Sequence, residues 1–208
     1  MLGRMAAKRL LDLSCATLFL LLLTPVLILV VSAMTVDMVL VPRDRGRFLY
    51  REPRISRGRV FSLLKFRTLR TDVLAQMRTS GSHARLFESD PANLTWAGRH
   101  VLKPWYLDEL PQLVNVLRGD ISLVGPRPWP PEMVERQAAE GLTYRNEVRA
   151  GLTGPAQVTK GSGIRFADLD LRYVEGLRNL RGLALVRYDL RILWATVRVI
   201  VRGEGLSY

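Results

Sequence analysis

Two adjacent carboxylates, Asp108 and Glu109, are the residues of this chain that most directly suggest catalysis. Pro111 follows the pair. Because proline is tolerated only in the first turn of a helix, we expect a helix to begin near Asp108, with both carboxylates in the positive field of its N-terminus.

The same position also has a purely structural interpretation. Asp is a preferred N-cap residue, and acidic side chains favour first turns for reasons unrelated to catalysis. Helical spacing of apolar residues predicts the helix itself, and Gly119 follows where a C-terminal cap belongs; the apolar residues are Leu110, Leu113, Val114 and Leu117. Position alone favours capping, so the surrounding residues must decide.

Three basic side chains lie in segments that could present them to phosphate. The segment 60–64 is typical of a short strand and runs into Lys65 and Arg67, which would share one face of an extended chain and could hold a diphosphate. Arg127 lies between two prolines, so its guanidinium can be presented at small entropic cost. A solvated basic edge strand and a rigid surface turn are the structural alternatives.

The charge balance points to an anionic partner. Lys and Arg total 31 against 19 acidic residues, giving a formal net charge of +12. This excess fits nucleic acid, lipid head groups or a phosphorylated substrate without choosing among them. The single cysteine, Cys15, excludes a disulfide framework within the chain. At 208 residues the chain is long enough for one domain with its own core.

An apolar run from Leu13 to Val36 carries no charged residue and exceeds the ~20 residues that a straight helix needs to cross a bilayer. Thr24 and Pro25 lie at its middle, where the proline predicts a sharp break and the threonine hydroxyl could bond the freed backbone. Both flanks are basic, with Arg4, Lys8 and Arg9 before the run and Arg43, Arg45 and Arg47 after it. Since the positive-inside rule favours the cytoplasm for both ends, we expect a re-entrant helix-break-helix anchor over residues 1–42. A kinked spanning helix is the alternative.

The remaining residues, 43–208, are expected to form one domain of the α/β class, mostly helical with short strands. Gly151 to Val158 is a second glycine–proline loop that enters a strand. The last segment predicts an amphipathic helix, with Val186, Leu190, Leu193, Val197 and Val201 on one face and Arg187, Arg191, Arg198 and Arg202 on another. Such a helix can rest on an anionic membrane surface, although a core-packing helix with a solvated arginine face is equally typical.

Several of these motifs follow one another in a specific order. They are Lys65-Phe66-Arg67-Thr68, Asp108 to Leu113 with Asn115-Val116, Gly119-Asp120, Ser122 to Pro128, and Gly151 to Gly154 with Gln157. Together they closely resemble the bacterial sugar transferase family, the monotopic phosphoglycosyl transferases, and the resemblance continues through Asp170, Tyr173 and Asp189. Each motif alone would be weak evidence, but their order is strong evidence.

The resemblance implies an undecaprenyl-phosphate sugar phosphotransferase of the small, minimal catalytic type. Such an enzyme moves a sugar 1-phosphate from a nucleotide diphosphate sugar, usually a UDP-sugar, to polyprenyl phosphate and releases a nucleoside monophosphate. This step begins the assembly of a surface glycan. The resemblance also implies an anchor in membrane lipid and a catalytic domain on the cytoplasmic face of the bacterial inner membrane.

The resemblance further assigns roles to individual residues. Asp108 is expected to be the nucleophile of a ping-pong mechanism with a phosphosugar-aspartyl intermediate. Glu109 is its partner, and the two carboxylates are expected to hold Mg²⁺. The substrate-binding residues are expected to be Lys65, Arg67, Arg127 and Gln157.

Two positions depart from the family's pattern. The segment from Lys103 to Leu107 includes Pro104, Trp105 and Tyr106, where the family usually carries an Arg and then a small polar residue ahead of Leu-Asp-Glu. This difference could reshape the pocket beside Asp108. Glu52 stands where a Gln is common.

A membrane-tethered nucleic-acid-binding protein is the main alternative function. It would require a helix-turn-helix, RNP-like or zinc pattern, and the sequence has none, so we expect no nucleic acid partner. An inactive polyprenyl-phosphate-binding scaffold is opposed by the intact Asp108, Glu109 and Arg127. The sequence does not specify the sugar, the base or the glycan pathway, and it is compatible with a homo-oligomer.

Overall fold

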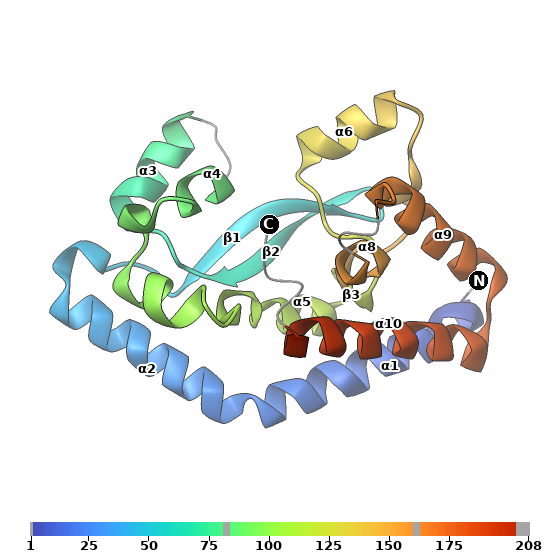
Figure 1. Cartoon of the computed structure of the whole chain (residues 1–208), viewed down its shortest axis with the longest axis horizontal. Coiled ribbons are helices and arrows are strands. Elements are labelled where there is room, and N and C mark those ends of the chain that lie inside the picture. Colours follow the sequence, from blue (N-terminus) through green and yellow to red (C-terminus); the bar gives the residue numbers. More distant parts are fainter. Residues whose placement is uncertain (1, 81–83, 160–162, 203–208) are drawn as a thin grey trace. The chain divides into compact units, whose positions relative to one another are not determined.

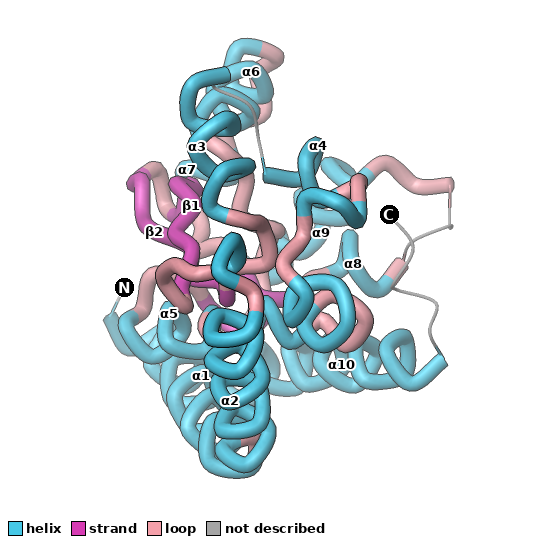
Figure 2. Tube along the Cα trace, turned by 90° about the vertical axis from the view of Figure 1, so that its left-hand side faces the viewer, coloured by secondary structure: helices cyan, strands magenta, loops and turns pink. Residues whose placement is uncertain are grey.

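The computed structural model describes residues 2–80, 84–159 and 163–202. Helices dominate it and the strands are short, which confirms the predicted class (Figure 1 and Figure 2). The elements are α1 (Leu2–Leu22), α2 (Thr24–Leu40), η1 (Pro42–Asp44), β1 (Leu49–Ser56), β2 (Arg59–Phe66), α3 (Thr71–Ser80), α4 (Ala84–Glu88), η2 (Pro91–Asn93), η3 (Gly98–Leu102), η4 (Leu107–Glu109), α5 (Gln112–Arg118), β3 (Ser122–Val124), α6 (Pro131–Ala139), α7 (Tyr144–Glu147), β4 (Gly151–Thr153), α8 (Pro155–Val158), α9 (Phe166–Asn179) and α10 (Gly182–Arg202).

The apolar run is broken where the sequence predicts. α1 ends at Leu22 and α2 begins at Thr24, with Pro25 in its first turn. The Thr24 hydroxyl donates to the Leu20 carbonyl at 2.8 Å, so the side chain bonds the backbone beside the proline as predicted. In the described part of the chain, no helix taken alone has the length and apolar character of a membrane span, whereas 5–22 and 24–40, bent by 58° at their junction, have them as a pair.

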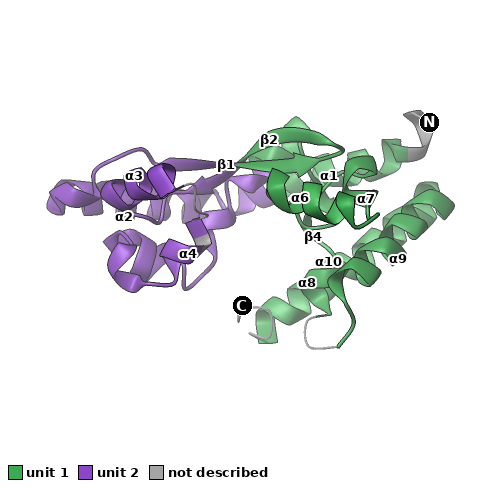
Figure 3. Ribbon diagram, turned by 90° about the horizontal axis from the view of Figure 1, so that it is seen from above, with its two compact units in different colours: residues 1–18, 53–63, 114–208 green, residues 19–52, 64–113 purple. Residues whose placement is uncertain are grey.

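The chain forms two compact units, which are coloured separately in Figure 3. Unit 1 comprises residues 1–18, 53–63 and 114–208, and unit 2 comprises residues 19–52 and 64–113. The predicted boundary between residues 42 and 43 therefore falls inside unit 2. The first part of α1 belongs to unit 1 because it is tied there by polar contacts, whereas α2 belongs to unit 2.

In unit 2, α2 packs against the segment that carries the acidic pair. Val30 and Met34 of α2 lie in a buried cluster together with Phe66, Ala97 and Leu102. Leu107 and Leu110, on either side of the acidic pair, pack against this cluster. The second half of the apolar run therefore supports the acidic segment through one face.

In unit 1, the two glycine–proline loops of the sequence form a single structure. β3 and β4 pair in parallel, with Ser122 opposite Gly151. The Gly125 amide donates to the Thr153 carbonyl at 2.8 Å. A Cβ at Gly151 would lie only 2.1 Å from the Gly125 nitrogen, so this approach of two backbones requires glycine.

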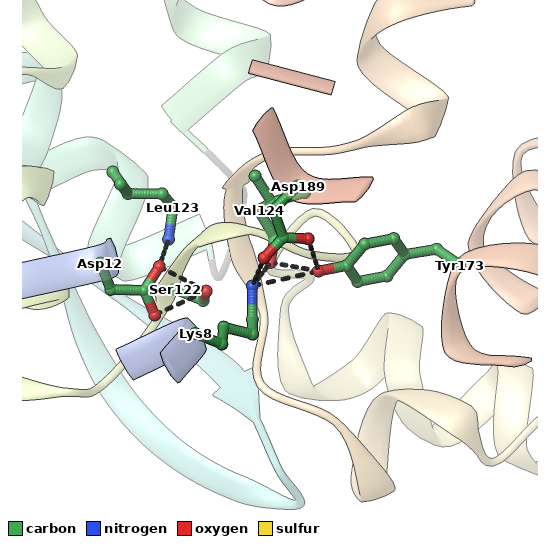
Figure 4. A network of polar contacts seen from close by, with 7 residues as sticks. All are labelled: Lys8, Asp12, Ser122, Leu123, Val124, Tyr173 and Asp189. Carbon is green, nitrogen blue, oxygen red and sulfur yellow. Dashed lines mark hydrogen bonds and ion pairs between the residues drawn. The ribbon is translucent and has the colours of Figure 1, made fainter. Parts of the chain in front are cut away.

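α1 joins unit 1 through polar side chains, as Figure 4 shows. The Lys8 ammonium lies 2.5 Å from Asp189 Oδ2 and donates to the Tyr173 hydroxyl at 3.1 Å and to the Val124 carbonyl at 3.0 Å. The Tyr173 hydroxyl donates in turn to Asp189 Oδ1 at 2.9 Å. Lys8 is 3% exposed and Asp189 is 0% exposed. The pair thus ties α1 to α10 inside the core of the unit.

Two further residues of α1 extend this polar contact. Asp12 accepts hydrogen bonds from the Ser122 hydroxyl and the Leu123 amide (Figure 4). Arg9 donates to two carbonyls in the last turn of α5. Lys8 and Arg9 belong to the basic flank from which the membrane topology is predicted. In the structure, the charged groups of both residues form hydrogen bonds or ion pairs within unit 1.

α10 confirms the predicted C-terminal helix, but another of its faces is buried. Leu185, Asp189 and Ile192 are buried. On the predicted apolar face, Leu190 and Val197 are exposed, as is Val201. The reason is the ion pair with Lys8, which places the side of α10 that carries Asp189 in the core.

Replacing Lys8 with Met should destabilise unit 1 strongly, because Asp189 would keep a buried charge without its cation. Breaking one partner of a buried pair costs roughly 3–5 kcal/mol. The double variant Lys8→Met/Asp189→Leu should recover much of this loss. Urea unfolding in detergent, followed by circular dichroism, measures both.

The control for this test is Arg165→Met, because Arg165 pairs with Asp168 but its side chain is 84% exposed. This change should affect stability far less, as exposed ion pairs contribute little. Equal losses in the Lys8 single variant and the double variant would contradict the assignment.

Candidate active site

The acidic pair lies on a short 3-10 turn, η4, and not at the N-terminus of an α-helix. α5 begins only at Gln112, so the predicted helix start at Asp108 is wrong. The Leu107 carbonyl accepts the Leu110 amide at 3.2 Å, an i to i+3 bond that makes this turn 3-10, and Pro111 directly precedes α5.

The other end of α5 agrees with the prediction. Gly119 has a φ of +86°, the left-handed conformation of a C-terminal cap. Its amide donates to the carbonyls of Asn115 and Val116 at 3.1 and 3.0 Å. Because Asp108 lies ahead of α5, it neither caps that helix nor lies at its positive end.

A lysine, rather than a helix end, provides the positive charge at Asp108. Asp108 is 3% exposed, and its Oδ2 lies 3.3 Å from the Lys103 ammonium. The same ammonium lies 2.7 Å from Glu88 Oε2. The Thr68 hydroxyl donates to the other Glu88 oxygen at 2.8 Å. Unit 2 therefore contains a continuous polar chain from Thr68 through Glu88 and Lys103 to Asp108.

The charges of this chain shift the pKa values of its members. Burial raises the pKa of Asp108, and Glu109 adds to the rise, while Lys103 and Lys65 oppose it. Burial alone would lower the pKa of Lys103, but the carboxylates of Asp108 and Glu88 raise it overall. Burial would raise the pKa of Glu88, yet Lys103 lowers it overall. The ammonium thus serves two carboxylates and favours the charged form of both.

The segment that departs from the family's pattern has an unusual backbone. η3 is a π-helical turn, and Lys103 follows it directly. Tyr106 has a φ of +55°, a left-handed conformation that is uncommon for a residue with a side chain. Such features concentrate at functional sites, since the surrounding structure must hold them. Here they set the direction of the chain immediately before Asp108.

Lys65 and Arg67 have different surroundings. Lys65 lies 3.7 Å from Glu52, so the Glu found in place of the family's Gln supplies an ion-pair partner. Arg67 lies beyond the end of β2 and is 3% exposed. Its guanidinium donates to the carbonyls of Asp44, Arg47 and Leu69. These contacts indicate that Arg67 holds the backbone of unit 2 rather than a substrate.

Arg127 and Gln157 belong to unit 1. The carbonyl of Arg127 accepts a hydrogen bond from Arg145 at 2.5 Å, and the Arg145 guanidinium lies 3.9 Å from the centre of the Trp129 ring. Arg145 also pairs with the buried Asp170 at 2.7 Å. Arg145, which the sequence did not indicate, thus holds the backbone of the proline-flanked loop.

Gln157 has a different character. Both its Oε1 and its Nε2 are buried and have no hydrogen-bond partner within the described residues. Buried amide groups are normally paired, so this side chain suits a bound polar group.

The acidic pair offers oxygen ligands suited to a divalent cation, although two carboxylates do not complete its coordination shell. The described residues contain no group of three or more His, Cys, Asp or Glu side chains placed to hold a metal. Mg²⁺ is commonly held by one or two carboxylates together with water and substrate phosphate oxygens. Asp108 and Glu109 can supply the protein's share of such a shell.

Sequence reasoning missed Glu88 and the role of Thr68. Glu88 is the last residue of α4, in a segment whose composition gave no chemical signal. Its importance comes from Lys103, its partner in space, and no spacing rule links the two. The sequence marks Lys103 only as part of a segment that departs from the family's pattern.

Comparison with known proteins assigns the family. The model of the family described as bacterial sugar transferase matches residues 3–203. The chain therefore belongs to the bacterial sugar transferase family. It is 35% identical over 202 residues to an undecaprenyl-phosphate glucose phosphotransferase of Komagataeibacter xylinus, covering 93% of this chain and 36% of that protein.

Two further relatives give the same assignment. An undecaprenyl-phosphate galactose phosphotransferase of Salmonella typhimurium is 33% identical, over 95% of this chain and 41% of that protein. An uncharacterized sugar transferase of Bacillus subtilis is 36% identical, over 98% of this chain and 91% of that protein. The chain thus spans well under half the length of the first two relatives and nearly all of the third.

Replacing Arg67 with Lys tests its structural role. A lysine cannot reproduce a guanidinium that bonds three carbonyls, so the free energy of unfolding should fall by about 1–3 kcal/mol. Under the function proposed below, the concentration of nucleotide sugar needed for half-maximal rate should change little. Lys65→Met is the comparison variant and should raise this concentration, because Lys65 adds positive charge near Asp108. A large loss of donor affinity in Arg67→Lys at unchanged stability would return Arg67 to the substrate site.

Proposed function

We propose that this protein transfers a sugar 1-phosphate from a UDP-sugar to polyprenyl phosphate, with undecaprenyl phosphate as the acceptor. The observation that carries the proposal is the buried Asp108 carboxylate, beside Glu109 and paired with Lys103, in a chain of the bacterial sugar transferase family. Two relatives carry names that state undecaprenyl-phosphate phosphotransferase activity on glucose and galactose. Those names support the reaction class and leave the sugar of this chain to a screen of donors.

The reaction would proceed in two displacements. An Asp108 oxygen attacks the phosphorus that bears the sugar, the bond from that phosphorus to the bridging oxygen breaks, and the nucleoside monophosphate leaves. An oxygen of polyprenyl phosphate then attacks the aspartyl phosphate. This forms the polyprenyl diphosphate sugar and restores the carboxylate. Each half of the reaction balances without an added oxidant or reductant.

The residues of unit 2 supply the electrostatics of this step. Lys103 and Lys65 stabilise negative charge as the phosphorus is attacked. Mg²⁺, held by Asp108 and Glu109, would neutralise the diphosphate. Arg127 and Gln157 are proposed as further substrate contacts, the first because its loop is fixed by Arg145 and the second because its amide is buried without a partner.

We also propose that the bent pair α1–α2 is a re-entrant anchor on the cytoplasmic face of the bacterial inner membrane. Both helices expose large apolar side chains, among them Leu10, Leu21, Leu22, Ile28, Leu29, Val39 and Leu40. Exposed apolar surface of this kind is typical of contact with lipid or another protein. The break at Thr24–Pro25 lets one apolar segment enter and leave the same leaflet.

α10 provides a second apolar surface of the same kind. Its exposed residues Leu183, Leu190, Trp194, Val197 and Val201 follow helical spacing. Exposed arginines border them, including Arg187 and Arg198. We propose that this face of α10 lies in the interfacial region of an anionic membrane.

Asp108→Asn should abolish turnover, by about 10,000-fold or more, because a neutral amide cannot attack phosphorus. Folding should be retained, since Asn has the same shape and Lys103 keeps its contact with Glu88. Wild-type protein given donor alone should release one nucleoside monophosphate per active site and gain the mass of one sugar phosphate. A folded variant with near wild-type turnover would end the nucleophile assignment.

Removal of divalent cations should stop the reaction. Excess chelator is expected to abolish release of nucleoside monophosphate, and Mg²⁺ should restore it better than Ca²⁺, because Mg²⁺ prefers the compact oxygen shell of a diphosphate with one or two carboxylates. Malachite-green detection after phosphatase treatment of the released nucleotide measures this. Full activity in chelator would reject the metal.

The membrane proposal predicts that both ends of the α1–α2 pair lie on the cytoplasmic side. Single cysteines introduced at Met5 and at Arg47, in a Cys15→Ser background, should both be unreactive toward an impermeant maleimide in intact cells and reactive in inverted vesicles. Labelling of the two ends on opposite faces would show a spanning helix instead. Replacing Thr24 and Pro25 with Leu should shift the anchor toward spanning and lower activity.

A further inference from the structure

We propose that Glu88 and Thr68 are positioning residues that hold the Lys103 ammonium against one oxygen of Asp108. This inference rests on the proposed function, because it assumes that Asp108 attacks phosphorus. It gives a positioning role to two residues outside the acidic pair.

The Lys103 ammonium needs a second partner to fix its position. A lysine ammonium is a point charge on a flexible four-carbon stem, whereas a guanidinium is a planar fork that orients itself on a carboxylate. The side chain of Lys103 is 30% exposed, so water is an alternative partner for its ammonium. The contact with Glu88, at 2.7 Å, is shorter than the contact with Asp108, at 3.3 Å. Glu88 therefore holds the ammonium more closely than the proposed nucleophile does.

The second step is that Glu88 is itself held in place. One of its carboxylate oxygens contacts Lys103, and the other accepts the Thr68 hydroxyl at 2.8 Å. Thr68 is 4% exposed, and its carbonyl accepts the Thr95 amide at 2.8 Å. Both oxygens of Glu88 are thus used, and its partner Thr68 belongs to the buried part of unit 2. The orientation of Lys103 is set by this rigid base.

The third step concerns the reacting atom. Lys103 contacts Oδ2 of Asp108, which leaves Oδ1 as the oxygen for attack on phosphorus. An ammonium held at this place also remains beside the acyl phosphate once the new P–O bond forms. Preorganised charge of this kind lowers the barrier because it needs no rearrangement during the reaction. Without Glu88, the ammonium can turn toward water and the choice of attacking oxygen is lost.

A merely structural salt bridge makes a different prediction. If Glu88 only stabilised the fold, its loss would lower the unfolding temperature and leave the rate of adduct formation unchanged in protein that is still folded. If Glu88 acts through Lys103, replacing Glu88 should slow adduct formation in the protein that has Lys103. In a variant that lacks Lys103, replacing Glu88 should not slow adduct formation further. A double-mutant cycle separates these cases.

The test measures the rate at which donor alone forms the phosphosugar adduct, by rapid quench and intact mass. Glu88→Gln should slow this step by up to about 100-fold, as expected when a reacting group is misplaced. Donor binding measured by calorimetry should change little. In the Lys103→Met background, Glu88→Gln should add no further loss. Thr68→Val should slow the step and Thr68→Ser should restore it.

Glu147→Gln is the matched control, because it removes a carboxylate from the surface pair with Arg178. It should form the adduct at the wild-type rate. A wild-type rate in Glu88→Gln, or losses that multiply in the double variant, would overturn the positioning role while leaving the nucleophile intact. Failure of the wild-type protein to release nucleoside monophosphate from donor alone would instead overturn the proposed function, and this inference with it. If Glu88→Gln does not fold, the Thr68 variants decide.

Discussion

The structure depends on one constraint, which is that a charge removed from water must find a partner. Each unit meets it with ion pairs between side chains that the fold brings together. In unit 1, Lys8 pairs with Asp189 and Arg145 pairs with Asp170. In unit 2, Lys103 serves both Glu88 and Asp108. Lys8, Asp189, Arg145 and Asp170 are buried, so these pairs lie on the buried faces of their helices, and Lys103 contacts the Asp108 carboxylate.

The constraint also explains why α1 buries charged side chains and exposes apolar ones. Lys8, Asp12 and Ala16 are buried with four-residue spacing, while Leu10 and Leu13 are exposed. A helix with a buried polar stripe and an exposed apolar surface is stable only where the apolar surface has a favourable medium. The polar stripe provides specific contacts to unit 1, and the apolar surface is left for lipid under the proposed function.

Local rules predicted the features that depend on local chemistry. Pro25 broke the apolar run because proline cannot donate the helical bond, and Gly119 capped α5 because glycine adopts a positive φ without strain. The amphipathic period of the last helix was also sufficient to place α10. Each of these depends on a single residue type or on the spacing within one segment.

The contacts that local rules do not predict depend on partners from other segments. Arg67 has the pattern of a phosphate ligand, yet carbonyls brought from residues 44, 47 and 69 surround its guanidinium. Glu88 has no pattern at all, since its partner follows fifteen residues later on another element. Partners brought together by the fold cannot be inferred from spacing along one segment.

The ion pairs within the fold also bear on how the net positive charge of the chain is interpreted. The net charge of +12 suggests an anionic partner, but Lys8, Arg145 and Lys103 are already paired with carboxylates within the fold. Exposed residues carry further positive charge, among them the arginines of α10 that border its apolar face. An exposed cationic border beside exposed apolar side chains matches the two layers of an anionic membrane, head groups and acyl chains. Under the proposed function, the phosphate of a lipid-linked acceptor would lie at such a boundary between head groups and acyl chains.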